Sequence, residues 1–118
     1  MMPDTEKLYD TKILIQTHQA DKDFVKYMVS LFVEHIPQSN ADLEKACAIN
    51  DWPKVYFYAH KMKASIDLFN LIQLKDLIRK IEQNAKNKID VETIPNNVSF
   101  VSSYIKNCIA EMKKDFKL

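Results

Sequence analysis

The sequence predicts an all-α protein: an antiparallel four-helix bundle with a short extra helix at the amino terminus. Three observations lead to this fold class. Apolar residues recur every three or four positions along most of the chain, which is the period of a helix with one buried face. The chain contains no glycine, and asparagine and proline stand at the breaks in the pattern. Its 118 residues suffice for one hydrophobic core, so we expect a single domain over residues 1–118.

A polar stretch separates the first two expected helices. The first is short and covers residues 10–17, and a long one follows, with Asp21 or Asp23 as the residue that caps its first turn. Pro37 lies inside the long pattern and removes one backbone hydrogen bond, so we expect it to kink this helix or to split it in two. The apolar stripe of the long helix comprises Phe24, Met28, Leu31, Phe32, Leu43, Ala46 and Cys47.

Asparagine residues mark the ends of the next helices. Asn50 can adopt the left-handed conformation that ends a helix and Asp51 can cap the next one, so a third helix is expected over residues 51–69. Asn70 ends that helix in the same way. A fourth helix frays in residues 84–90, and the last begins near residues 93–95. The inner faces are Trp52, Val55, Ala59, Met62, Ile66 and Phe69, then Leu74, Leu77, Ile78, Ile81 and Ala85, then Val98, Val101, Ile105, Cys108, Met112 and Phe116.

Charge and hydropathy argue against two classes of partner. The net charge is +1, from 17 basic and 16 acidic residues, and this balance does not indicate a nucleic-acid-binding protein. No apolar run approaches the ~20 residues that span a bilayer, and no apolar signal segment stands at the amino terminus. We therefore expect a cytoplasmic protein that does not insert into membranes.

The absence of glycine and the few cysteines limit the chemistry of the chain. Phosphate-binding loops such as GxxxxGK[ST] and GxGxxG need glycine, so any phosphoryl group must come from another molecule. Cys47 and Cys108 lie among apolar neighbours and are interpreted as small buried hydrophobes. Their separation excludes a CxxC metal site, and no glutamate stands three residues before a histidine, the pattern of metal sites in helical bundles.

Residues 59–65 read AHKMKAS and place one histidine just before two lysines, Lys61 and Lys63. At about 100° per residue, His60 lies on the shoulder of the third helix, beside the core stripe and open to solvent. Lys63 lies nearer the core, with its ammonium group free to turn toward His60. A histidine that accepts a phosphoryl group needs a neutral, reachable nitrogen, nearby cations and small neighbours that let a partner approach. These conditions are met by His60, Lys61, Lys63, Ala64 and Ser65.

The ordinary alternative for such a residue is a solvated surface histidine, because lysines are common on helix surfaces. The other histidines provide a comparison within the chain. Neither His18 nor His35 combines a lysine three residues on with a small residue four residues on. Only His60 is a candidate on this pattern.

The motif AHKMKAS, followed by IDLFNL, resembles the signature of histidine-containing phosphotransfer (HPt) domains, which read A-H-x-[LMI]-K-[small]-S before an apolar stretch. Residues 21–55 are also similar to the family, with a phenylalanine-bearing helix, a break at proline, a Leu/Ala helix and an acidic-tryptophan step into the histidine helix. The resemblance covers about residues 10–85. The last helix is similar to the family only in its general character.

This resemblance implies a four-helix bundle that carries a phosphoryl group between the aspartates of receiver domains. It makes His60 the phosphoacceptor and Lys63 the lysine beside the phosphate, with Lys61 as a secondary charge. Ala64 takes the position that is usually glycine and leaves steric clearance, and Asn70 replaces a later family glycine. The alternative is a helical scaffold or inhibitor that binds a response regulator without phosphotransfer.

The resemblance also implies which molecules the chain works with. Its partners would be response-regulator receiver domains and a hybrid sensor histidine kinase, and we expect a monomer. It would be a phosphoryl carrier without its own ATP site, and hence not an enzyme. It would need no cofactor of its own and hold no metal, since the receiver supplies Mg²⁺.

A second stripe on the third helix lies well off the core face and runs through Phe57, Lys61, Ala64 and Leu68. An exposed Phe and Leu beside a reactive histidine would form a small apolar docking surface for a receiver helix, and we include the adjacent Asp67 in it. The equal alternative is that the apolar members pack against another helix of the bundle. Tyr56 is expected to border the core.

Overall fold

The computed structural model describes residues 7–18 and 21–118. The helices in these ranges are α1 (Lys12–His18), α2 (Lys22–Ala48), α3 (Trp52–Leu68), α4 (Ile72–Asn87), the 3₁₀ helix η1 (Val91–Thr93) and α5 (Ile94–Phe116). No strand occurs in the described part of the chain, so the all-α class is confirmed.

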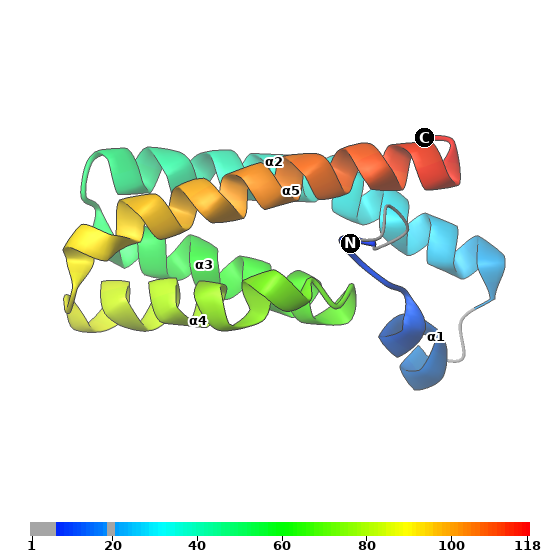
Figure 1. The fold of residues 1–118 in the computed structure, drawn as a ribbon, viewed down its shortest axis with the longest axis horizontal. Coiled ribbons are helices and arrows are strands. Elements are labelled where there is room, and N and C mark those ends of the chain that lie inside the picture. Colours follow the sequence, from blue (N-terminus) through cyan, green and yellow to red (C-terminus); the bar gives the residue numbers. More distant parts are fainter. Residues whose placement is uncertain (1–6, 19–20) are drawn as a thin grey trace, which may run out of the picture.

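Helices α2 to α5 form the bundle, with short turns that make consecutive helices antiparallel (Figure 1). Helix α3 packs most extensively against α4, and α2 contacts both α3 and α5. Helix α1 lies at the end of the bundle where α2 begins (Figure 1). The antiparallel bundle and the extra amino-terminal helix agree with the sequence-based expectation.

The helix ends expected at residues 50, 51 and 70 are present, whereas α4 stays helical to Asn87 instead of fraying from residue 84. Asp21, rather than Asp23, caps α2 by accepting a hydrogen bond from the backbone N–H of Phe24 at 2.8 Å. Asn50 and Asn70 have φ values of 56° and 52°, so both are in the left-handed region that ends a helix. Asp51 caps α3 by accepting from the N–H of Lys54.

Pro37 does not split the second helix, so that form of the prediction is wrong. Helix α2 continues without a break from Lys22 to Ala48, with Pro37 inside it. A proline in a helix loses one hydrogen bond but keeps a φ angle that suits the helix. Because α2 packs along both α3 and α5, burial of its apolar face offsets that loss.

The apolar stripe of α2 is rotated relative to the prediction at its amino-terminal end. Phe24 is 41% exposed, whereas Val25 and Val29 are buried. The residues that face the core follow helical spacing from Val25, and Phe24 is adjacent to that stripe rather than in it. Met28 and Leu31 are half-buried for the same reason.

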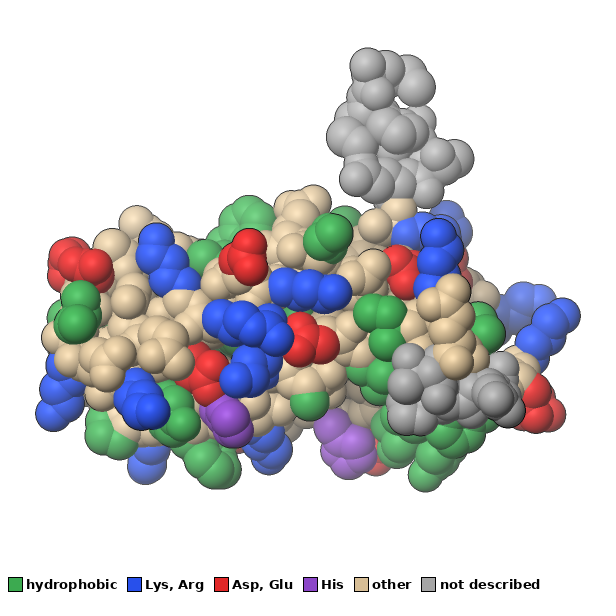
Figure 2. Space-filling model, turned by 90° about the horizontal axis from the view of Figure 1, so that it is seen from below, with side chains coloured by type: hydrophobic (Ala, Val, Ile, Leu, Met, Phe, Trp, Pro, Cys, Tyr) green, Lys and Arg blue, Asp and Glu red, His purple; other side chains and the backbone are tan. Residues whose placement is uncertain are grey.

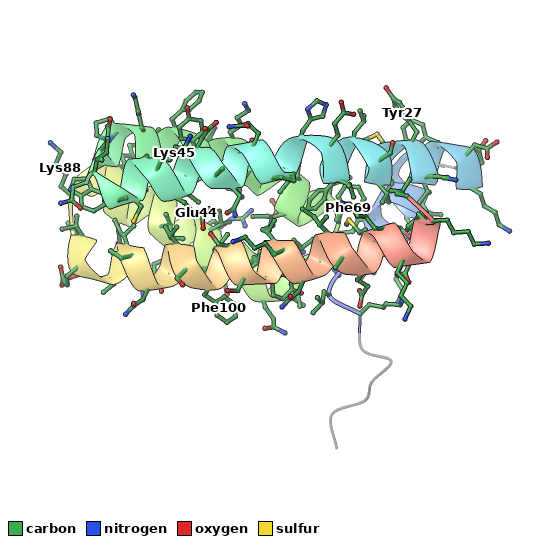
Figure 3. The ribbon with its side chains drawn as sticks, turned by 90° about the horizontal axis from the view of Figure 1, so that it is seen from above. Tyr27, Glu44, Lys45, Phe69, Lys88 and Phe100 are labelled. Atoms are coloured by element: carbon green, nitrogen blue, oxygen red, sulfur yellow. The ribbon has the colours of Figure 1, made fainter. Side chains whose placement is uncertain are left out.

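The inner faces of the other helices lie mostly in the core. Figure 3 shows Phe69 pointing into the bundle, whereas Tyr27 and Phe100 point away from it. Trp52, Leu77 and Phe116 are only half-buried. Cys47 and Cys108 are buried and carry free thiols, and burial raises the pKa of Cys108 to about 12. None of the helices in residues 7–18 and 21–118 is long and apolar enough to cross a membrane.

The segment before α1 is bound to two parts of the bundle. The side chains of Lys7 and Tyr9 both reach the carboxylate of Asp115 in the last turn of α5. The backbone N–H of Asp10 donates to the carbonyl of Phe69 at 2.9 Å. The amino-terminal segment therefore connects the end of α5 to the turn between α3 and α4.

Candidate functional site

His60 lies on α3 with its imidazole directed away from the core. Its neighbours in the stripe, Ala59 and Met62, are completely buried and fix the orientation of the helix. The His60 side chain is 58% exposed. The shoulder position expected from the sequence is confirmed.

Glu82 of α4 connects His60 to the bundle. The Nδ1 atom of His60 is hydrogen-bonded to Oε2 of Glu82, and the ammonium group of Lys63 donates to Oε1 of the same carboxylate at 3.1 Å. The Glu82 side chain is only 5% exposed, so the acceptor is buried whereas the histidine is accessible. An ionised carboxylate can only accept, so in the neutral imidazole Nδ1 carries the proton and the outer nitrogen Nε2 carries the lone pair.

The charge state of Glu82 follows from its surroundings. Burial alone would raise the pKa of Glu82, but the hydrogen bonds from His60 and Lys63 and the charge of Lys63 hold it below the ordinary value of 4.5. The carboxylate is therefore ionised at neutral pH. A buried anion with two donors holds the Nδ1–H tautomer of His60 in place.

A family model described as the Hpt domain matches residues 28–115. The chain belongs to the Hpt domain family. The matched region begins in α2 and ends in the last turn of α5, so it contains His60, Lys63 and Glu82, whereas α1 lies outside it. Hpt domains act as phosphocarriers in phosphorelays, and family membership indicates a histidine phosphotransfer role here. No curated protein sequence and no solved structure matches the chain significantly.

The contacts of the Hpt lysines refine the sequence-based interpretation. Lys63 was expected to have its ammonium group free to turn toward His60, but that group is hydrogen-bonded to Glu82, the residue that also binds His60. The positive charge of Lys63 therefore lies beside the carboxylate that binds Nδ1 of His60. Lys61 and Ala64, one and four residues after His60, are both exposed.

The residues of the expected docking stripe differ in their surroundings. Phe57 is 56% exposed. Leu68 is half-buried and lines a small hollow against α2 together with Met28 and Leu31. Asp67 forms a two-pronged ion pair with Arg79 of α4, with N–O distances of 3.1 and 2.6 Å. Phe57 thus offers apolar surface, whereas Leu68 and Asp67 also contact other helices.

Glu82 was missed by the sequence analysis, although the sequence contains a signal for it. The inner face of α4 runs through Leu74 and Ile78 to Ala85, and Glu82 falls four residues after Ile78 within that apolar stripe. A carboxylate at a core position needs a partner, because an unpaired buried charge is strongly unfavourable. The partner itself could not be read from the sequence, since His60 lies 22 residues away.

A large surface hollow is separate from this site. It has a volume of about 740 Å³, and its lining includes Ile15 of α1, Val25 of α2 and Phe116 of α5. None of the residues around His60 lines it. On the face of the molecule seen from below, basic and acidic side chains are mixed along the middle (Figure 2). Among the described residues, no group of three His, Cys, Asp or Glu side chains is placed to hold a metal ion.

Proposed function

We propose that this chain is a phosphoryl carrier in which Nε2 of His60 accepts a phosphoryl group from the aspartyl phosphate of a receiver domain and passes it to the aspartate of another. The observation that carries the proposal is the contact between His60 and Glu82. It leaves the second ring nitrogen with a lone pair on an exposed side chain.

The transfer step uses the groups at this site in a simple way. The Nε2 lone pair attacks phosphorus, the N–P bond forms, and the P–O bond to the aspartate breaks as the carboxylate leaves. The proton stays on Nδ1, so the imidazole ring becomes positively charged. Glu82 faces that charge, and stabilisation of a charge that develops during reaction lowers the barrier. The reverse sequence delivers the group to the next receiver.

Two lysines support the phosphorylated state. Lys63 compensates the buried charge of Glu82, and Lys61 lies exposed next to His60. An added phosphoryl group is attracted by nearby ammonium groups, and small neighbours let a receiver close over the ring. Ala64 supports that approach because it is exposed and has only a methyl side chain.

The remaining requirements of the reaction fall on the partner. We expect the receiver to supply Mg²⁺ and its own acidic cluster, and a hybrid sensor histidine kinase to begin the relay. The chain itself needs no cofactor and does not phosphorylate itself from ATP. We expect it to work as a cytoplasmic monomer that docks receivers through Phe57, Lys61, Ala64, Asp67 and Leu68.

A phosphotransfer assay tests this function. The wild type, His60→Gln and His35→Gln are mixed with Mg²⁺ and a panel of phosphorylated receivers, and the chain is examined for acid-labile, alkali-stable phosphate. His35 is an exposed histidine on α2, so it controls for the loss of any surface imidazole. We expect label on the wild type and on His35→Gln only. Receiver binding without label on the wild type would instead support a scaffold.

A further inference from the structure

A tyrosine ring lies against the imidazole of His60. Tyr56 is one turn earlier on α3, and its ring is stacked with the His60 ring at a centroid distance of 5.8 Å and an interplanar angle of 27°. The two residues differ in burial, because Tyr56 packs against the core whereas His60 is exposed. The exposed His60 ring is therefore stacked on the Tyr56 ring, which the bundle holds in place.

Helix α4 supplies Glu82, which binds His60, and it also contacts Tyr56, which is stacked on His60. Glu82 binds Nδ1, and one turn later Lys86 extends its ammonium group over the Tyr56 ring, 5.9 Å from the centroid. A cation over an aromatic face is attracted by the electrons of the ring. Tyr56 is thus held by the core and by Lys86 together.

The two contacts of His60 restrict different motions. The hydrogen bond to Glu82 fixes the direction of Nδ1, but it leaves the ring plane able to tilt about that bond. A stacked neighbour fixes the plane. Because the Nε2 lone pair lies in the ring plane, both restrictions together define the direction from which phosphorus must approach.

We propose that Tyr56 is a positioning residue that orients the His60 imidazole for in-line attack on the phosphoryl group of a docked receiver. This inference rests on the proposed phosphoryl-carrier function. A docked receiver presents phosphorus from one direction, so a misoriented nucleophile reduces the rate even when the receiver is bound. A small phosphodonor in solution approaches from any direction and does not depend on this orientation.

The test compares Tyr56→Leu and Tyr56→Phe with the wild type. Tyr58→Leu is the matched control, because Tyr58 is a half-buried tyrosine on the same helix that lines a hollow with Asp42 and Lys45 of α2. Transfer from a phosphorylated receiver is measured in single turnovers over a range of receiver concentrations. Phosphorylation by phosphoramidate, which needs no docking, is measured in parallel.

If Tyr56 positions the imidazole, its variants should change the rate of transfer from a receiver but not the rate with phosphoramidate. Tyr56→Leu lowers the maximal transfer rate by about three- to tenfold, in keeping with the loss of one aromatic pair, without changing the half-saturating receiver concentration. Its phosphoramidate rate stays within about twofold of the wild type, because no fixed approach is required. Tyr56→Phe keeps the ring and restores transfer, and Tyr58→Leu leaves both rates unchanged.

Other outcomes overturn the proposal. A change confined to the half-saturating concentration would make Tyr56 a docking residue, and an equal fall in both rates would mean that it alters the reactivity of the imidazole. Since Tyr56→Leu could unfold, NMR of the wild type gives a second test: Overhauser contacts must join the ring protons of Tyr56 and His60. Their absence would contradict the inference. If wild-type His60 reacts with phosphoramidate but with no receiver, the proposed function fails, whereas the ring contact can still be present.

Discussion

Two carboxylates in this Hpt domain each accept hydrogen bonds from two side chains, yet they serve different ends. Glu82 binds His60 and Lys63 between α3 and α4, and Asp115 binds Tyr9 and Lys7 at the end of α5. The Glu82 side chain is 5% exposed, whereas that of Asp115 is 24% exposed. The two carboxylates therefore have similar hydrogen-bond patterns but differ in how deeply they are buried.

Burial of the acceptor decides what each cluster does. A buried carboxylate that loses its donors is left with an uncompensated charge, so Glu82 holds its partners firmly. An ion pair near solvent is screened and contributes little, so Asp115 serves as a tether for the amino-terminal segment. In the first cluster the accessible group is the imidazole of His60, and in the second it is the ammonium group of Lys7. The same hydrogen-bond pattern therefore orients an exposed imidazole at one site and fastens a chain segment at the other.

The largest expected effect is on phosphotransfer. Glu82→Ala removes the acceptor of the His60 Nδ1–H, so the imidazole loses its fixed tautomer and its counter-charge. We expect the transfer rate to fall on the order of 10- to 100-fold, as for loss of a charged hydrogen bond. Asp115→Ala should transfer at the wild-type rate. Equal rates for the two variants in single-turnover assays would break the comparison.

The second effect is on stability. Glu82→Ala leaves the ammonium group of Lys63 without its carboxylate and creates a space in the α3–α4 interface, so the free energy of unfolding should fall by roughly 1–3 kcal/mol. Asp115→Ala should cost less, because its carboxylate is nearer to solvent. Chemical denaturation of both variants measures the difference. A larger loss for Asp115→Ala would reverse the ranking of the two clusters.

The third effect is a pH dependence whose sign follows from the pKa of Glu82, which folding lowers below 4.5. A lowered pKa stabilises the folded state above the unfolded-state value, and this stabilisation is lost as the pH falls through the folded-state value. The stability gap between wild type and Glu82→Gln should therefore be widest near neutral pH and should close below about pH 4.5. A gap that stays constant in acid would show that Glu82 acts through packing alone.

The smallest effect concerns the tether. The hydrogen bond from Tyr9 and then that from Lys7 lower the pKa of Asp115 below 3.8, and partial burial opposes them. Tyr9→Phe removes the hydroxyl group, so NMR titration should show a higher pKa for Asp115, with a stability loss of about 1 kcal/mol or less. Phosphotransfer should not change. Impaired transfer would mean that the tether also acts on the His60 site.

The sequence predicted those parts of the fold that depend on local chemistry. Asn50 and Asn70 end helices because asparagine tolerates positive φ, and Asp51 caps the next helix because its side chain accepts from a nearby N–H. These effects act over a few residues and are readable from the chain. The helical stripe likewise located His60 on the shoulder of α3.

The errors came from interactions between helices. The exposure of Phe24 and the continuity of α2 through Pro37 depend on how α2 packs against α3 and α5. The contacts of His60 with Glu82, and of Tyr56 with Lys86, join α3 to α4. Such pairs require the register of two helices, which a single sequence does not provide.

The most direct test of the account is the position of the phosphoryl group on the phosphorylated protein. The chain is phosphorylated by a receiver, and ³¹P and ¹⁵N NMR of the intact protein distinguish the two ring nitrogens. We predict a single phosphoramidate on Nε2 of His60, with Nδ1 still protonated and bonded to Glu82. Phosphate on Nδ1, or on another residue, would contradict the account.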